Sequence, residues 1–119
     1  PPMMSTLEQA STPNPNGFRE IEVQRLAAGR GAARLIDVRE PSEYRAELGH
    51  IAGAELVPLA TVDQAARAWD RDQEIVLVCR SGGRSGRAAA TLAAMGFKRV
   101  INMAGGMLAW NAAGLPVER

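Results

Sequence analysis

The chain has 119 residues, which suits one compact domain and is too short for two. Hydrophobic residues make up 46% of it, enough for a core, and the net charge of +1 argues neither for nor against nucleic acid. A single cysteine excludes an internal disulfide, a Cys-x-x-Cys redox pair and a cysteine-rich zinc site. It is typical of a reducing compartment, and no apolar run approaches membrane-spanning length, so we predict a cytoplasmic protein without a membrane partner.

The first 16 residues, PPMMSTLEQASTPNPN, are rich in Ser, Thr, Pro and Asn and lack the regions of a signal peptide. We therefore expect residues 1–16 to be a disordered tail or a remnant of cloning, and one domain over residues 17–119. The domain begins with Val23, Leu26 and Ala27 at helical spacing, before glycines that can end a helix. A short apolar strand at residues 34–38 follows, and then a turn and short helix with Pro41 in its first turn.

Strands and helices continue to alternate after that turn. Residues 54–57 predict a short strand, and Thr61 and Gln64 fit a capping box before a helix with one apolar face. Residues 75–78 are apolar at consecutive positions, as in a central parallel strand covered on both faces. An Ala-rich helix at 85–95, a strand at 99–102, a turn at Gly105-Gly106 and a final helix complete the chain. The pattern predicts an α/β fold with a central, mostly parallel sheet and helices on both faces.

The only cysteine, Cys79, lies one residue beyond the most buried predicted strand, where parallel sheets bind their ligands. A lone cysteine is most often an inert core residue. Here the chain turns at once through Arg80, Ser81, Gly82, Gly83, Arg84 and Ser85 into a helix. Glycines permit a nest of backbone N–H groups, and the following helix adds a positive N-terminal end. Both features favour thiolate over thiol, and the thiolate is the nucleophile.

Charge is distributed unevenly along the sequence. Residues 75–117 contain no Asp or Glu, but they hold five basic residues: Arg80, Arg84, Arg87, Lys98 and Arg99. Such a region attracts anions, and the three arginines behind Cys79 favour a small-anion site. No aromatic residues interleave for base stacking, so we expect no nucleic-acid partner. The single histidine, His50, could in principle form a dyad with Cys79, although no orienting residue lies near it in sequence and a histidine anchoring a turn is commoner.

Four segments resemble the rhodanese family of single-domain sulfurtransferases: LIDVREPSEY, GHIAGAELVPL, IVLVCRSGGRS and GFKRVINMAGGMLAWNAAGLPV. The resemblance covers about residues 18–117 and implies a single rhodanese-like domain. It implies that Cys79 takes a sulfane sulfur from thiosulfate as a persulfide and passes it to a thiol, cyanide or protein-thiol acceptor. Residues 80–84 would then cradle the persulfide, and Arg80 and Arg84 would bind the anionic donor. No cofactor or metal motif is visible.

The resemblance also assigns supporting roles and leaves alternatives. Asp37 and Arg39 resemble positions that brace the fold near the active loop, and Gly105 and Gly106 resemble a structural turn. Four residues separate Tyr44 from Gly49, where compact family members have about two, which leaves the choice of acceptor open.

Two other functions compete with the sulfurtransferase. A related phosphatase or arsenate reductase would place five residues between its cysteine and arginine, whereas four separate Cys79 from Arg84, and Val78 replaces the usual phosphatase histidine. A persulfide carrier or interaction module without small-molecule turnover is the second alternative.

Overall fold

The computed structural model describes residues 4–119, which form one six-stranded sheet in the order β1-β2-β6-β5-β3-β4. Only the β1–β2 pair is antiparallel, so the sheet is mostly parallel, as predicted. The strands are β1 (Thr12–Pro13), β2 (Arg19–Ile21), β3 (Arg34–Asp37), β4 (Glu55–Leu56), β5 (Ile75–Val78) and β6 (Val100–Met103).

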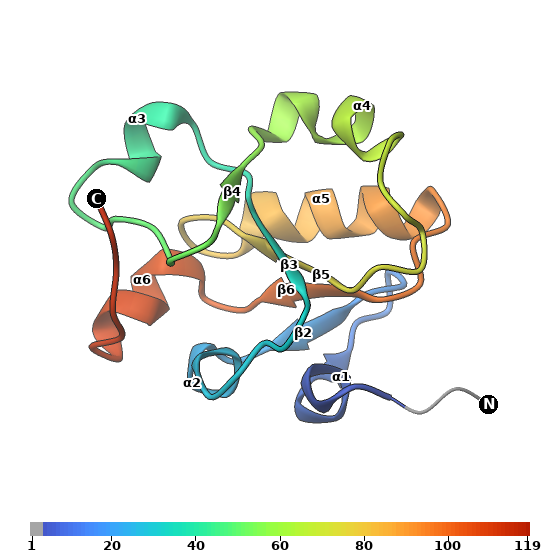
Figure 1. Cartoon of the computed structure of the whole chain (residues 1–119), viewed down its shortest axis with the longest axis horizontal. Helices are drawn as coiled ribbons and strands as arrows, with labels where there is room; N and C mark the ends of the chain where they lie inside the picture. Colours follow the sequence, from blue (N-terminus) through green and yellow to red (C-terminus); the bar gives the residue numbers. More distant parts are fainter. Residues whose placement is uncertain (1–3) are drawn as a thin grey trace.

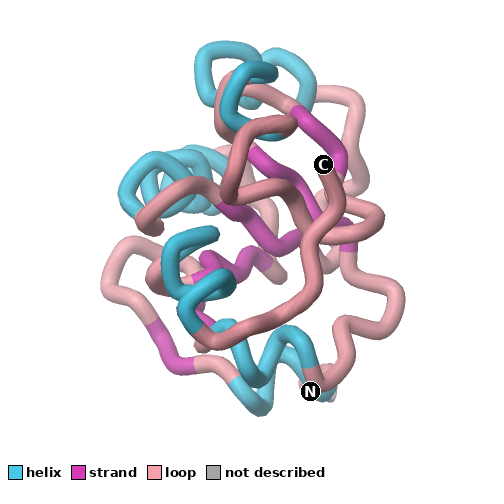
Figure 2. The backbone as a smooth tube through the Cα atoms, turned by 90° about the vertical axis from the view of Figure 1, so that its left-hand side faces the viewer, coloured by secondary structure: helices cyan, strands magenta, loops and turns pink. Residues whose placement is uncertain are grey.

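Helices cover both faces of this sheet, which confirms the predicted α/β architecture. Figure 1 shows α4 and α5 on one side and α1, α2 and α6 on the other, and in Figure 2 the strands run as a row between helices. The helices are α1 (Thr6–Ala10), α2 (Val23–Ala27), α3 (Pro41–Tyr44), α4 (Val62–Ala66), α5 (Gly83–Ala94) and α6 (Gly106–Ala112), with a 3-10 turn at Leu59–Thr61. No helix within residues 4–119 is long and apolar enough to cross a bilayer.

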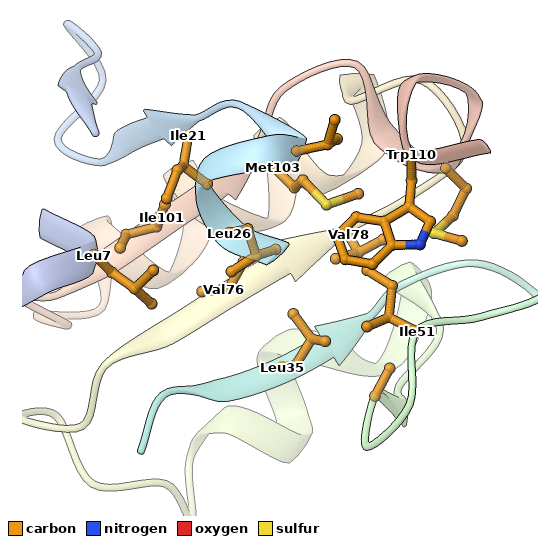
Figure 3. Packing of buried hydrophobic residues seen from close by; sticks show 13 residues of the cluster. Leu7, Ile21, Leu26, Leu35, Ile51, Val76, Val78, Ile101, Met103 and Trp110 are labelled. Carbon is orange, nitrogen blue, oxygen red and sulfur yellow. The ribbon is translucent and has the colours of Figure 1, made fainter. Parts of the chain in front are cut away.

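The sheet separates two hydrophobic cores, and β5 contributes to both. Val76 and Val78 pack into the core beneath α1, α2 and α6, while Ile75 and Leu77 pack against α4 and α5. Successive side chains of a strand point to opposite faces, which explains why all four positions of β5 are apolar. Figure 3 shows the first core, with Trp110 near the carboxyl end of β5.

The N-terminal segment differs from the expected tail. From Met4 onward it is described, and α1 buries Leu7 in the first core at 2% exposure. Ser5 and Glu8 form the capping box that starts this helix, and their three-residue spacing is the one expected of such a box. The expected domain boundary at residue 17 therefore omits an element that packs on the core. Residues 1–3 of the expected tail lie outside the described residues.

Two further local details differ from expectation. Strand β2 was not predicted, because its sequence, REI, has one buried apolar residue and resembles a surface turn. The capping box expected at Thr61 is wrong: the Thr61 hydroxyl donates to the carbonyl of Pro58 at 2.9 Å and makes no bond to the helix N-terminus. The 3-10 turn before α4 explains the difference, because it directs that hydroxyl backwards.

Candidate active site

Cys79 follows β5 directly and continues the alternation of that strand, so its side chain packs in the core on the α5 side. Its sulfur accepts hydrogen bonds from the Gly82 backbone N–H at 3.1 Å and from the Ser85 hydroxyl at 3.2 Å. The residue is 1% exposed and Ser85 is fully buried. The strand thus brings the thiol to the base of a loop whose donors point at its sulfur.

The loop of residues 79–85 is shaped by glycines and closed by α6. Gly82 has φ +103° at the start of α5, a conformation that glycine adopts without strain. A β-carbon on Gly106 would lie 2.5 Å from the Arg80 carbonyl group, so only glycine fits at that contact. The N–H groups of Met107 and Leu108 donate to the carbonyls of Cys79 and Arg80, each at 2.9 Å. The start of α6 therefore holds the loop, a contact that the turn prediction did not include.

The environment lowers the pKa of the Cys79 thiol. Burial by itself would raise that pKa, but hydrogen bonds outweigh it: the Ser85 hydroxyl and the backbone N–H groups of Ser85, Gly82 and Ser81 all favour the thiolate. These donors carry no net charge. Hydrogen bonds from the anion nest expected of the glycine-containing turn are thus the largest contribution that lowers the pKa of Cys79, and the Arg84 charge also interacts with this residue.

The arginines of the loop are placed differently from one another. Arg84 donates two hydrogen bonds to the carboxylate of Glu43, at 2.7 and 2.8 Å, and this contact lowers the pKa of Glu43 to about 2. Arg80 and Arg87 are exposed, and within residues 4–119 neither side chain has a hydrogen bond or ion pair. The net positive charge near the Cys79 thiol is consequently smaller than the number of arginines in the sequence after Cys79 suggested.

Acidic residues from other segments explain that difference. Arg99 lies 3.3 Å from Glu8 and 3.6 Å from Glu74, and Lys98 lies 3.9 Å from Asp72. The expectation of an uncompensated basic stretch is therefore wrong for three of its five basic residues, counting Arg84. Folding brings carboxylates from other segments close to these basic residues, although residues 75–117 contain none.

Asp37 and Arg39 form a buried pair where β3 ends. Two Arg39 nitrogens contact the two Asp37 carboxylate oxygens at 2.9 and 2.7 Å, and the side chains are 0% and 1% exposed. Arg39 also donates to the backbone carbonyls of Gly49 at 2.8 Å and Glu43 at 3.3 Å. The pair thus fastens the segment between α3 and β4 to the end of the sheet, next to β5.

His50 lies in that fastened segment and makes no hydrogen bond to Cys79. Its Nδ1 is 2.9 Å from the carbonyl oxygen of Tyr44, its ring stacks on the Tyr44 ring, and its Nε2 is 3.8 Å from Glu118. The longer Tyr44–Gly49 segment is held by Asn111, which donates to the Leu48 carbonyl at 3.0 Å. These contacts give His50 the role of a turn anchor rather than a base.

Asn102 contacts the loop of residues 79–85, and its role was not predicted from the sequence. This residue of β6 is 3% exposed, and its side-chain nitrogen donates to the Gly82 carbonyl at 3.2 Å and to Glu20 at 3.0 Å. A polar amide inside the otherwise apolar strand VINM was the available signal. The contact positions the same glycine whose N–H donates to the Cys79 sulfur.

The sequence matches the family model of the rhodanese-like domain over residues 22–113, which is most of the chain. The chain therefore belongs to the rhodanese family, as its four sequence segments indicated.

The relatives of this chain include proteins named for sulfur transfer. It is 43% identical over 76 residues to a putative sulfur carrier protein of Bacillus subtilis (YrkF), covering 64% of this chain and 40% of that protein. It is 39% identical over 79 residues to a thiosulfate sulfurtransferase of Pseudoalteromonas translucida (GlpE), covering 66% and 73%. The match thus spans less than half the length of the carrier relative.

The fold has solved counterparts. A crystal structure of a rhodanese-related protein from Thermoplasma volcanium superposes with a TM-score of 0.75 at 28% identity, covering 83% of this chain and 96% of that one. A single rhodanese-like α/β domain is thereby shown.

Proposed function

We propose that this protein is a sulfurtransferase that carries a sulfane sulfur from thiosulfate to a thiol or cyanide as a persulfide on Cys79. The main support is the placement of the Cys79 sulfur, which accepts bonds from the Gly82 N–H and the Ser85 hydroxyl at the base of the loop. Family membership and the sulfur-transfer relatives support the same reaction class.

In the first step, the Cys79 thiolate attacks the outer sulfur of thiosulfate. A new S–S bond forms, the S–S bond of thiosulfate breaks, and sulfite leaves with the bonding electron pair. The lowered pKa of Cys79 supplies the thiolate without a general base. Arg80, the exposed residue that follows Cys79, attracts the dianionic donor, and the loop N–H groups hold the terminal sulfur of the persulfide.

In the second step, a thiolate or cyanide attacks the outer sulfur of the persulfide and Cys79 leaves as thiolate. The N–H groups that lower the thiol pKa stabilise this leaving group as well, so the same cradle serves both half-reactions. Asp37 and Arg39 act as supporting residues that hold the neighbouring segment, and Ser81, Gly83 and Arg84 complete the donor site.

The carrier function is the second candidate, and the named carrier relative favours it. It shares the first step and differs in the acceptor, which is then a protein thiol instead of a small molecule. The two functions therefore diverge only after the persulfide has formed.

Intact-protein mass spectrometry after incubation with thiosulfate tests the proposal. We expect the reduced wild-type protein to gain the mass of one sulfur atom, and Cys79→Ser to gain nothing. Because the chain has one cysteine, a gain can be assigned without further mapping.

The acceptor is tested by adding cyanide or a small thiol to the loaded protein. Loss of the added mass with release of thiocyanate or a persulfide supports the enzyme, whereas stable loading that only a protein thiol removes supports the carrier. A folded wild-type protein that gains no mass contradicts thiosulfate as donor.

A further inference from the structure

The Glu43 carboxylate occupies the face of Arg84 that an anion would use. Its two oxygens accept from the two terminal nitrogens of the guanidinium, at 2.7 and 2.8 Å. This is the two-point geometry in which arginine also binds sulfate-like and phosphate-like oxygens. The family resemblance implies that Arg84 binds the donor, but in the structure the Glu43 carboxylate already contacts its two terminal nitrogens.

Glu43 is fixed at this place by its own segment. It lies in the short helix α3, where one carboxylate oxygen also accepts the backbone N–H of Glu40 at 3.1 Å. The Glu43 backbone carbonyl accepts from Arg39, at 3.3 Å. The carboxylate is therefore delivered to Arg84 by a segment that the buried Asp37–Arg39 pair anchors.

The contact is nevertheless open to exchange. The side chains of Arg84 and Glu43 are 30% and 28% exposed, so water and small anions reach the pair. Partly exposed ion pairs contribute little to stability, and their partners can be replaced at small cost. Arg84 is the second residue of α5 and follows Gly82 and Gly83 in the loop that carries Cys79. Its charge interacts with Cys79, so a freed guanidinium remains near the thiol.

We propose that Glu43 is a specificity-determining residue that competes with an anionic sulfur donor for Arg84. While the pair is closed, the carboxylate offsets the charge of Arg84, and Arg80 is the exposed cation of the loop. An anionic donor gains both terminal nitrogens of Arg84 only by displacing the carboxylate, which weakens its binding. A donor or acceptor without negative charge does not meet this competition, so Glu43 shifts the selectivity of the site away from small anions.

This inference rests on the proposed function for its substrate, but its test does not need turnover. Iodoacetate and iodoacetamide alkylate a thiolate by the same displacement of iodide, and they differ in one negative charge. The ratio of their rates at Cys79 therefore reports how strongly the site attracts an anion. Because the chain has one cysteine, mass spectrometry follows both rates without interference.

The variant is Glu43→Gln, which removes the charge and keeps an oxygen for the Glu40 N–H. Its matched control is Glu47→Gln, which removes the same charge from the exposed segment that follows α3. We expect the iodoacetate-to-iodoacetamide ratio to rise roughly three- to tenfold in Glu43→Gln, the effect of freeing one partly exposed charge. It should stay near the wild-type ratio in Glu47→Gln.

Thiosulfate kinetics provide the second readout: Glu43→Gln should lower the KM by a similar factor with little change in kcat. An unchanged alkylation ratio in a folded Glu43→Gln protein, or an equal rise in Glu47→Gln, overturns the inference even if thiosulfate loads Cys79. A raised ratio together with no sulfur loading keeps the role of Glu43 and rejects thiosulfate as the donor.

Discussion

Two arginine–carboxylate pairs lie close to the end of the sheet that carries Cys79. In each pair two guanidinium nitrogens contact both carboxylate oxygens, but the pairs differ in burial. Asp37 and Arg39 are 0% and 1% exposed, whereas Glu43 and Arg84 are 28% and 30% exposed. A buried charge that loses its partner is costly, while a partly exposed one can turn to water. The first pair is therefore a fixed part of the fold, and the second is a contact that a ligand can open.

The two pairs are also linked to each other. Arg39 donates to the backbone carbonyl of Glu43, so the buried pair places the residue that contacts Arg84. The two pairs therefore have different roles that follow from their burial. The buried Asp37–Arg39 pair supports the segment that contains Glu43, and the partly exposed Glu43–Arg84 pair adjusts the charge that a substrate meets. Predictions for each pair can separate these roles.

The largest expected effect is on stability. Asp37→Asn leaves the Arg39 guanidinium buried without its carboxylate and should lower the free energy of unfolding by about 3–5 kcal/mol. Glu43→Gln should lower it by less, because solvent screens this partly exposed pair. Urea unfolding of both variants beside wild type measures the difference. Equal losses in the two variants would show that burial does not distinguish the pairs.

A smaller effect is expected on donor use when Arg84 is removed. Arg84→Ala deletes a cation and also leaves the Glu43 carboxylate unpaired beside the loop, where it repels an anionic donor. We expect kcat/KM for thiosulfate to fall by about 1–3 kcal/mol in transition-state free energy, the size of a lost charge-assisted contact.

The double variant Arg84→Ala/Glu43→Gln separates the two causes, because it removes the repelling carboxylate together with the arginine. It should recover part of the loss, and the interaction energy of the cycle measures their coupling. A double variant as impaired as Arg84→Ala would mean that the free carboxylate does not affect the donor.

Signals that are continuous in sequence predicted the central part of the fold. Strand β5 is a run of four apolar residues and β3 has two at its centre. The loop after β5 contains the thiol, the glycines and Ser85 within seven residues. Helix α1 was missed because a five-residue helix depends on tertiary contacts, here the burial of Leu7. The spacing of Ser5 and Glu8 fits a capping box, but this spacing alone does not show whether the helix packs on the core.

The parts of the site that were not predicted depend on residues far apart in the chain. Glu43 and Arg84 are 41 positions apart, and Asn102 lies 20 positions from Gly82. No periodicity or composition relates such positions, because only the folded sheet places the end of β3 beside the end of β5. Counting charge along residues 75–117 failed for the same reason.

The smallest expected effect concerns the thiolate. If Glu43 cancels most of the Arg84 charge, neutral hydrogen bonds have to lower the Cys79 pKa, and the Ser85 hydroxyl is the strongest of them. Ser85→Ala should therefore raise that pKa, so less thiolate is present at pH 7 and alkylation by iodoacetamide becomes slower. Loss of one hydrogen bond corresponds to about 1 kcal/mol, or somewhat less than one pH unit in the midpoint of the rate profile. Ser81→Ala is the matched control, since Ser81 contributes through its backbone N–H, which the substitution retains. A midpoint that moves equally in both variants would show that the Ser85 hydroxyl has no specific role, and the thiolate would then depend on the loop backbone alone.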